Sequence, residues 1–153
     1  MTVYYAKPDQ TYQEHLEAVY AAWKQTIEYK RPLIERLSKK YDFSIESFTK
    51  GSLMTVVLHD IGKNIEPFQK MMHATRGETK FDRRKNYRHE LISFNFAFRA
   101  WVDLKKENEY SPCPLEALAV AGHHRPIDFD LLSFEREKIA DLPMAFQEGI
   151  KEA

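Results

Sequence analysis

The sequence predicts an all-α fold, a single compact helical domain that encloses a buried metal site. Apolar residues recur at helical spacing along most of the chain. The length of 153 residues suits one domain, and no linker, internal repeat or low-complexity tract divides it. Five of the six histidines stand in short polar contexts, which indicates a shared chemical site rather than scattered surface residues.

The first expected element is an amphipathic helix over residues 11–29, which carries His15. Pro32 is tolerated in the first turn of a helix, where its missing N–H costs nothing. We therefore expect a second helix to start near Arg31 and to extend toward Tyr41.

Ser44 is placed to cap the next helix, which runs from Ile45 into the apolar stretch 53–58. Val56 and Val57 in this stretch would also suit a strand. Since the surrounding segments are all helical and no turn residue intervenes, we interpret the stretch as a buried helix.

Gly62 is expected to break that helix, and Asn64 to cap a short one that has Pro67 in its first turn. From His73 to Arg88 apolar residues are few, which predicts a mobile loop. Cations cluster in this segment and would either contact phosphates or form only a solvated basic loop: Lys80, Arg83, Arg84, Lys85 and Arg88.

Residues 89–104 predict a central helix, because apolar side chains cover nearly its whole circumference. Prolines and Ser111 then indicate a stop over residues 111–114. A helix of small residues over 115–121 is expected to deliver His123 and His124 at its C-terminal end. Residues 129–153 predict one or two further helices.

Charge and composition exclude several classes of protein. Lys and Arg together number 23, as do Asp and Glu, so the chain lacks the basic footprint of a general nucleic-acid binder and must hold any polyanion locally. No targeting segment or membrane-length apolar window is apparent, which makes a cytoplasmic protein without membrane contact the expectation.

The histidine contexts point to a metal-dependent hydrolase. They are His15, His59-Asp60-x-x-Lys63, Arg88-His89-Glu90 and the pair His123-His124. Imidazole and carboxylate together suit Mn, Fe, Co, Ni or Zn, and an Asp beside a His can bridge two such ions. Cys113 stands alone and cannot form a thiolate cage, so nitrogen and oxygen must supply the ligands.

Taken together, these motifs resemble the HD-type nuclease domain of CRISPR interference systems, which occurs alone or fused to a DNA helicase. The resemblance rests on His15, His59-Asp60-Ile61-Gly62-Lys63, Pro67-Phe68-Gln69, Arg88-His89-Glu90 with Ser93, and Ala119-Val120-Ala121-Gly122-His123-His124. It covers the chain from His15 to about Arg125. His59-Asp60 alone is a weak signal, whereas all the motifs in this order are specific.

The resemblance implies that the domain cuts single-stranded DNA with one or two divalent ions, Mn, Ni, Co, Fe or Mg. It implies one metal site at His15, His59 and Asp60, and a second at Asp60, His89, His123 and His124, with Asp60 as the bridge. Lys63 would orient the scissile phosphate or the attacking water. Arg83, Arg84 and Arg88 would contact the substrate. The implied partners are a CRISPR helicase domain or subunit and an RNA-guided targeting complex.

One feature departs from the family pattern, which supplies a further aspartate well beyond the paired histidines. Asp128, Asp130 and Asp141 are the available carboxylates, and none matches it. Residues 1–153 therefore form either an HD nuclease domain with a weakened first site or a C-terminally truncated fragment of a longer chain.

Other functions and structural roles compete with the nuclease. An HD phosphohydrolase acting on nucleotides or cyclic nucleotides would share the His-Asp core, and a catalytically impaired scaffold domain would lack turnover. Each histidine also has a structural alternative, such as a hydrogen-bonded pair at a helix end or a favourable contact with the helix dipole.

Overall fold

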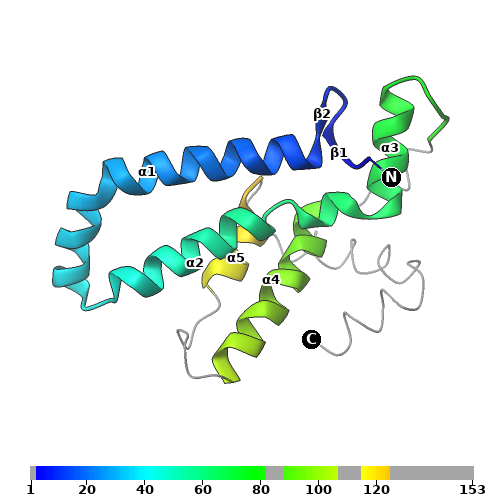
Figure 1. Cartoon of the computed structure of the whole chain (residues 1–153). Coiled ribbons are helices and arrows are strands. Elements are labelled where there is room, and N and C mark those ends of the chain that lie inside the picture. The colour runs from blue at the N-terminus through cyan, green and yellow to red at the C-terminus, as the bar shows by residue number, and fades with distance from the viewer. Residues whose placement is uncertain (1–2, 82–87, 107–114, 125–153) are drawn as a thin grey trace.

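The computed structural model describes residues 3–81, 88–106 and 115–124, and over these ranges the fold is helical, as predicted (Figure 1). The elements in chain order are β1 (Tyr5–Lys7), β2 (Gln10–Thr11), α1 (Tyr12–Tyr41), α2 (Ile45–Leu58), the 3-10 turn η1 (Ile61–Asn64), α3 (Glu66–Thr75), α4 (His89–Lys106) and α5 (Leu115–Gly122). The antiparallel hairpin of β1 and β2 was not predicted, since both strands are too short to show a pattern.

The helix α1 is one element of 30 residues, so the prediction of a second helix starting near Arg31 is wrong. Its first turn is a capping box, in which the Thr11 hydroxyl accepts from the Glu14 N–H and the Glu14 carboxylate accepts from the Thr11 N–H. Pro32 lies inside α1, and the helix bends toward its C-terminal end (Figure 1). A proline interrupts one N–H bond of a helix, and here it bends the element instead of starting a new one.

Ser44 caps α2 as expected, because its hydroxyl accepts from the Ser47 N–H. The apolar stretch 53–58 is helical, which confirms the choice of helix over strand. The expectation that it is buried is wrong: its side chains are half-buried, and Val57 is 38% exposed. The helix packs against α1, α4 and α5, and these neighbours leave part of each side chain in this stretch exposed.

The turn after α2 differs from the prediction in detail. The helix ends at Leu58, before Gly62, and His59 and Asp60 lead into η1. The N-cap of α3 is Ile65, which makes no side-chain cap, so the capping role of Asn64 is wrong; Pro67 lies in the first turn as expected. The helix then continues through His73, where a loop was predicted.

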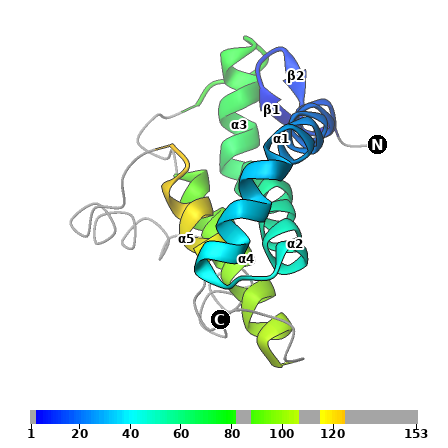
Figure 2. The ribbon, with the colours of Figure 1, turned by 90° about the vertical axis from the view of Figure 1, so that its left-hand side faces the viewer.

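Two apolar clusters form the core around α4. One joins Ile92 to Ile65, Phe68 and Met72, and the other joins Ala97 to Ala117 and Val120 of α5. The view in Figure 2 shows α5 lying against α4, which confirms the predicted central helix and the close packing of small residues.

The part of the chain that the structure describes contains no helix long and apolar enough to cross a membrane. The stop predicted over 111–114 and the helices predicted over 129–153 lie outside the described residues.

Candidate metal centre

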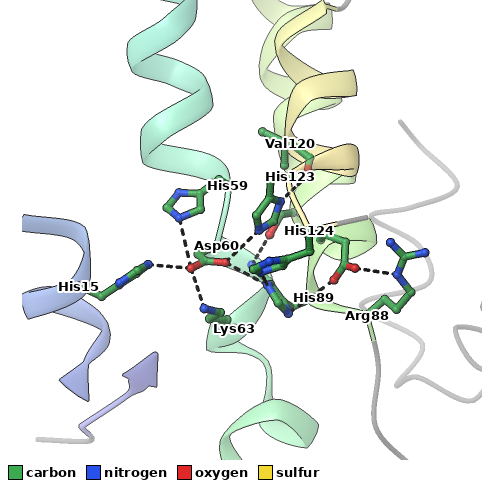
Figure 3. Close-up of polar contacts among 12 residues, drawn as sticks. His15, His59, Asp60, Lys63, Arg88, His89, Val120, His123 and His124 are labelled. Carbon is green, nitrogen blue, oxygen red and sulfur yellow. Dashed lines mark hydrogen bonds and ion pairs between the residues drawn. The ribbon is translucent and has the colours of Figure 1, made fainter. Parts of the chain in front are cut away.

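Asp60 lies at the centre of the site, at the junction of α2 and η1, and is only 3% exposed. A buried carboxylate costs free energy unless cations or hydrogen-bond donors surround it. Figure 3 shows that side chains from four separate stretches of the chain point toward it. The short stretch between α2 and η1 therefore positions the group that organises the whole site.

One carboxylate oxygen of Asp60, Oδ2, faces the N-terminal side of the site. His15 Nε2 lies 2.8 Å from it, His59 Nε2 3.2 Å and Lys63 Nζ 2.7 Å. His15 comes from the second turn of α1, His59 follows the last residue of α2, and Lys63 lies one turn after Asp60. Three segments thus converge on a single oxygen atom.

The other oxygen, Oδ1, faces the start of α4 and the end of α5. His89 Nε2 lies 3.0 Å from it and His123 Nε2 3.4 Å. His124 completes this side, with its Nε2 3.1 Å from His89 Nε2. The packing of α5 on α4 therefore brings together His89 and His124, which are 35 residues apart in the sequence.

Backbone contacts orient two of these rings. His59 Nδ1 lies 2.7 Å from the Val56 carbonyl and His123 Nδ1 2.6 Å from the Val120 carbonyl. A carbonyl only accepts, so each Nδ1 donates, and the neutral ring then carries its lone pair on Nε2, toward Asp60. A nitrogen lone pair facing a carboxylate oxygen is repulsive unless a cation lies near both.

The donor set fits divalent metal ions. Asp60 Oδ1 and His123 Nε2 are buried without a hydrogen bond, although they face one another. The candidate ligand atoms form two groups, one of His15, His59 and Asp60 and one of Asp60, His89, His123 and His124, and the atoms of each group lie within 4.8 Å of one another. Neutral imidazole and carboxylate are ligands that first-row metals accept. Both groups contain Asp60.

The electrostatics keep Asp60 ionised. Burial alone would raise the pKa of Asp60, but in the metal-free protein His123, His59 and His89, when they present an N–H to the carboxylate, and Lys63 hold that pKa far below its ordinary value. Burial lowers the pKa of both His15 and His124, which favours the neutral, metal-binding form of these rings. For His123, burial is outweighed by Asp60 and the Val120 carbonyl, and its pKa is raised.

Further residues lie beside the candidate ligands without facing Asp60. Arg88 Nε donates to Glu90 Oε1 at 2.7 Å, and Glu90 Oε2 lies 3.6 Å from His89 Nδ1. Ser93 is fully buried, and its Oγ accepts from the Gly62 N–H at 2.9 Å. Neither Glu90 nor Ser93 was assigned a role from the sequence. Glu90 is adjacent to His89 and Ser93 lies one turn beyond it, and these positions are the signal that could have identified them.

The predicted site residues have three outcomes. The structure brings together His15, His59, Asp60, Lys63, His89, His123 and His124, whose function as ligands or catalytic groups stays a proposal. Arg88 is bonded to Glu90 and points away from Asp60 (Figure 3). Arg83, Arg84, Asp128, Asp130 and Asp141 lie outside the described residues. His73, which was not assigned to the site, lies apart on α3 and pairs with Glu78.

Comparison with known proteins identifies the family. A family model described as the HD domain of Cas3 matches residues 10–148. The CRISPR-associated endonuclease Cas3-HD of Pyrococcus furiosus is 34% identical over 120 residues, which cover 77% of this chain and 47% of that protein. The chain thus spans about half the length of this relative. No solved structure gives a significant match. Because the family match extends over most of its length, the chain belongs to the Cas3 HD-domain family.

Proposed function

We propose that this domain is a divalent-metal-dependent phosphodiesterase that cleaves single-stranded DNA in CRISPR interference. The observation that carries the proposal is the Asp60 carboxylate, whose two oxygens face two separate groups of imidazoles. A carboxylate in this position can bridge two metal ions, and the Pyrococcus relative is named an endonuclease.

In this proposal His15, His59 and Asp60 hold one ion, and Asp60, His89, His123 and His124 hold the other. The candidate ions are Mn, Ni, Co, Fe and Mg, since imidazole with carboxylate accepts several of them. Bound ions would activate a water and neutralise charge that develops on the phosphate. The carbonyls of Val56 and Val120 keep the rings of His59 and His123 oriented for this task.

Lys63 is the proposed group for the scissile phosphate or the attacking water. Its ammonium lies 2.7 Å from Asp60 Oδ2, and the residue is 7% exposed. A buried ammonium at this position presents a point charge at the edge of the metal centre. A phosphate oxygen entering there would gain a cationic partner.

We propose that the segment containing Arg83 and Arg84 contacts the DNA backbone, where cations position the strand without reading its sequence. The contacts of Arg88 support a different role for this residue. Its guanidinium is bonded to the buried Glu90, and its side chain is 14% exposed. Arg88 thus serves to hold Glu90 beside His89.

The proposal also includes the location of the domain and the partners with which it works. The relative is named as CRISPR-associated, and we infer that this domain works in the cytoplasm with a CRISPR helicase domain or subunit and an RNA-guided targeting complex. The partners would deliver single-stranded DNA, because the balanced charge of the chain gives it no general attraction for nucleic acid.

The test is cleavage of a labelled single-stranded DNA beside duplex DNA and a panel of nucleotides and cyclic nucleotides. Each reaction is run with EDTA, Mg, Mn, Co or Ni, using the wild type, Asp60→Ala and the control His73→Ala. We expect metal-dependent cutting of the single strand that only Asp60→Ala abolishes. Preference for the nucleotides would support the phosphohydrolase instead, and metal uptake without any turnover would support a scaffold.

A further inference from the structure

Gln69 is a buried polar residue outside the candidate metal centre, and its side-chain amide is hydrogen-bonded to backbone groups. It lies in the first turns of α3 and is 7% exposed. Its amide nitrogen donates to the carbonyls of Tyr5 at 2.9 Å and Lys63 at 2.7 Å, and its amide oxygen accepts from the Tyr5 N–H at 2.9 Å. Both N–H groups of the amide are therefore satisfied.

The two bonds to Tyr5 take the place of the backbone hydrogen bonds that a neighbouring strand would make. Tyr5 is paired with Thr11 of β2 on one side, and the bonds to Gln69 occupy both of its backbone groups. A hairpin of strands this short is not stable by itself. The side chain of Gln69 thus closes β1 where a further strand would otherwise lie.

The third bond links this hairpin to the metal centre. The Lys63 carbonyl belongs to η1, whose turn is closed by the bond from the Lys63 N–H to the Asp60 carbonyl at 2.9 Å. On the other side, the Tyr12 N–H donates to the Tyr4 carbonyl at 2.8 Å, which joins the hairpin to the start of α1. One turn later, α1 presents His15 to Asp60.

We propose that Gln69 is a positioning residue that holds the His15 and Lys63 side of the metal centre together. Its amide bonds to backbone groups and not to either of these side chains, and it acts by fixing the start of α1 and the turn η1 to one amide group. The histidines on the other side of Asp60, His89, His123 and His124, come from α4 and α5, and η1 is also held to α4 by the bond from the Gly62 N–H to Ser93 Oγ. The proposal rests on the proposed function, in which both sides bind metal.

Two variants of the full chain separate positioning from general stability. Gln69→Glu keeps the shape of the side chain and the oxygen acceptor, but its carboxylate cannot donate to the carbonyls of Tyr5 and Lys63. Gln69→Met has a similar size and removes all three hydrogen bonds of the side chain. Gln25→Glu, at an exposed position on α1, is the matched control. Helicity is followed by circular dichroism, and the titrating ion is Mn²⁺.

We expect the wild type and Gln25→Glu to take up two Mn²⁺ and each Gln69 variant only one. Adding His124→Ala to Gln69→Glu should abolish uptake, whereas adding His15→Ala should change it no further. A purely structural role would lower the stability of the protein and leave uptake at two ions. That result, or loss of both ions from a folded Gln69 variant, would overturn the proposal.

A metal-free measurement distinguishes failure of this proposal from failure of the proposed function. Amide hydrogen exchange at Lys63 should become about tenfold faster in both Gln69 variants, because η1 loses the donor that it shares with the hairpin. Exchange at Tyr5 should become faster in Gln69→Met, which also removes the acceptor of the Tyr5 N–H. If the wild type bound no Mn²⁺, the proposed metal centre would fail, and the exchange of the Lys63 N–H would still decide the positioning role. Unchanged exchange there would overturn it.

Discussion

Gly62 and the backbone of His89 approach each other so closely that no side chain fits between them. A Cβ placed on Gly62 would lie 2.2 Å from the His89 carbonyl oxygen and 3.0 Å from the Ser93 nitrogen. This contact seats η1 directly on the first turn of α4, and it places Asp60 Oδ1 3.0 Å from His89 Nε2. The glycine is thus required by the close approach, and the site depends on it.

Replacing Gly62 by alanine should therefore push η1 away from α4. We expect Gly62→Ala to lower the free energy of unfolding by about 3 kcal/mol and to weaken Mn²⁺ binding, since backbone atoms must move to relieve the overlap. Urea unfolding and calorimetric titration measure the two effects. Gly77→Ala is the control: its φ of 79° costs about 1–2 kcal/mol, but nothing lies within 4 Å of the new Cβ. Equal losses of metal affinity in the two variants would argue against this account.

The histidines should divide between two ions. We expect His15→Ala and His124→Ala each to reduce Mn²⁺ uptake from two ions to one, because each ring belongs to a different group around Asp60. His73→Ala should keep both ions, since His73 pairs with Glu78 on the outside of α3. Equilibrium dialysis with metal analysis counts the ions. Loss of both ions in either single variant would show that the two groups form one indivisible site.

The ion pair of Arg88 and Glu90 should contribute to stability. Arg88→Met leaves a carboxylate that is 5% exposed without its cation, so we expect a loss of up to about 3 kcal/mol in metal-free urea unfolding. Adding Glu90→Gln should recover most of the loss. Arg31→Met breaks an exposed pair with Glu35 and should cost at most about 0.5 kcal/mol. If Arg88→Met lowered affinity for DNA and left stability unchanged, a direct phosphate contact would be the better explanation.

The capping box of α1 predicts a dependence of stability on pH. Hydrogen bonds from the Thr11 hydroxyl and N–H lower the pKa of Glu14 in the folded protein. This contribution is present above the unfolded pKa of about 4.3 and is lost as the pH falls through the lower, folded pKa. In the metal-free protein, Glu14→Gln should therefore reduce the slope of unfolding free energy against pH in the acid range.

Thr11→Val tests whether the slope comes from this hydrogen bond. In the Glu14→Gln background it should leave the acid slope as it is, because the titrating partner is already gone. An acid slope that Glu14→Gln does not change would contradict the assignment.

The helices and the composition of the site follow from local patterns. The end of α2 and the end of α5 each deliver histidines, and these ends are visible in the sequence because the apolar periodicity stops beside them. The sequence could therefore predict that His59, Asp60, His123 and His124 lie at helix ends. It could not give the distances between them, which depend on how α5 packs on α4.

The features that were missed are contacts between distant segments. The bonds from Gln69 to Tyr5 span 64 residues, and the bond from Gly62 to Ser93 spans 31. The spacing of apolar residues along the sequence gives no information about such contacts. The continuation of α1 through Pro32 was also missed, because the sequence around Pro32 is compatible both with the first turn of a new helix and with a bend inside one helix.

The central claim is that the Asp60 carboxylate joins two metal ions, and electron paramagnetic resonance of the Mn²⁺-loaded protein tests it most directly. Two Mn²⁺ ions that share one carboxylate give an exchange-coupled spectrum, whereas separate ions give independent six-line spectra. We predict a coupled spectrum at two Mn²⁺ per chain in the wild type and its absence in Asp60→Ala. Two bound ions with uncoupled spectra, or a coupled spectrum that survives in Asp60→Ala, would contradict the claim.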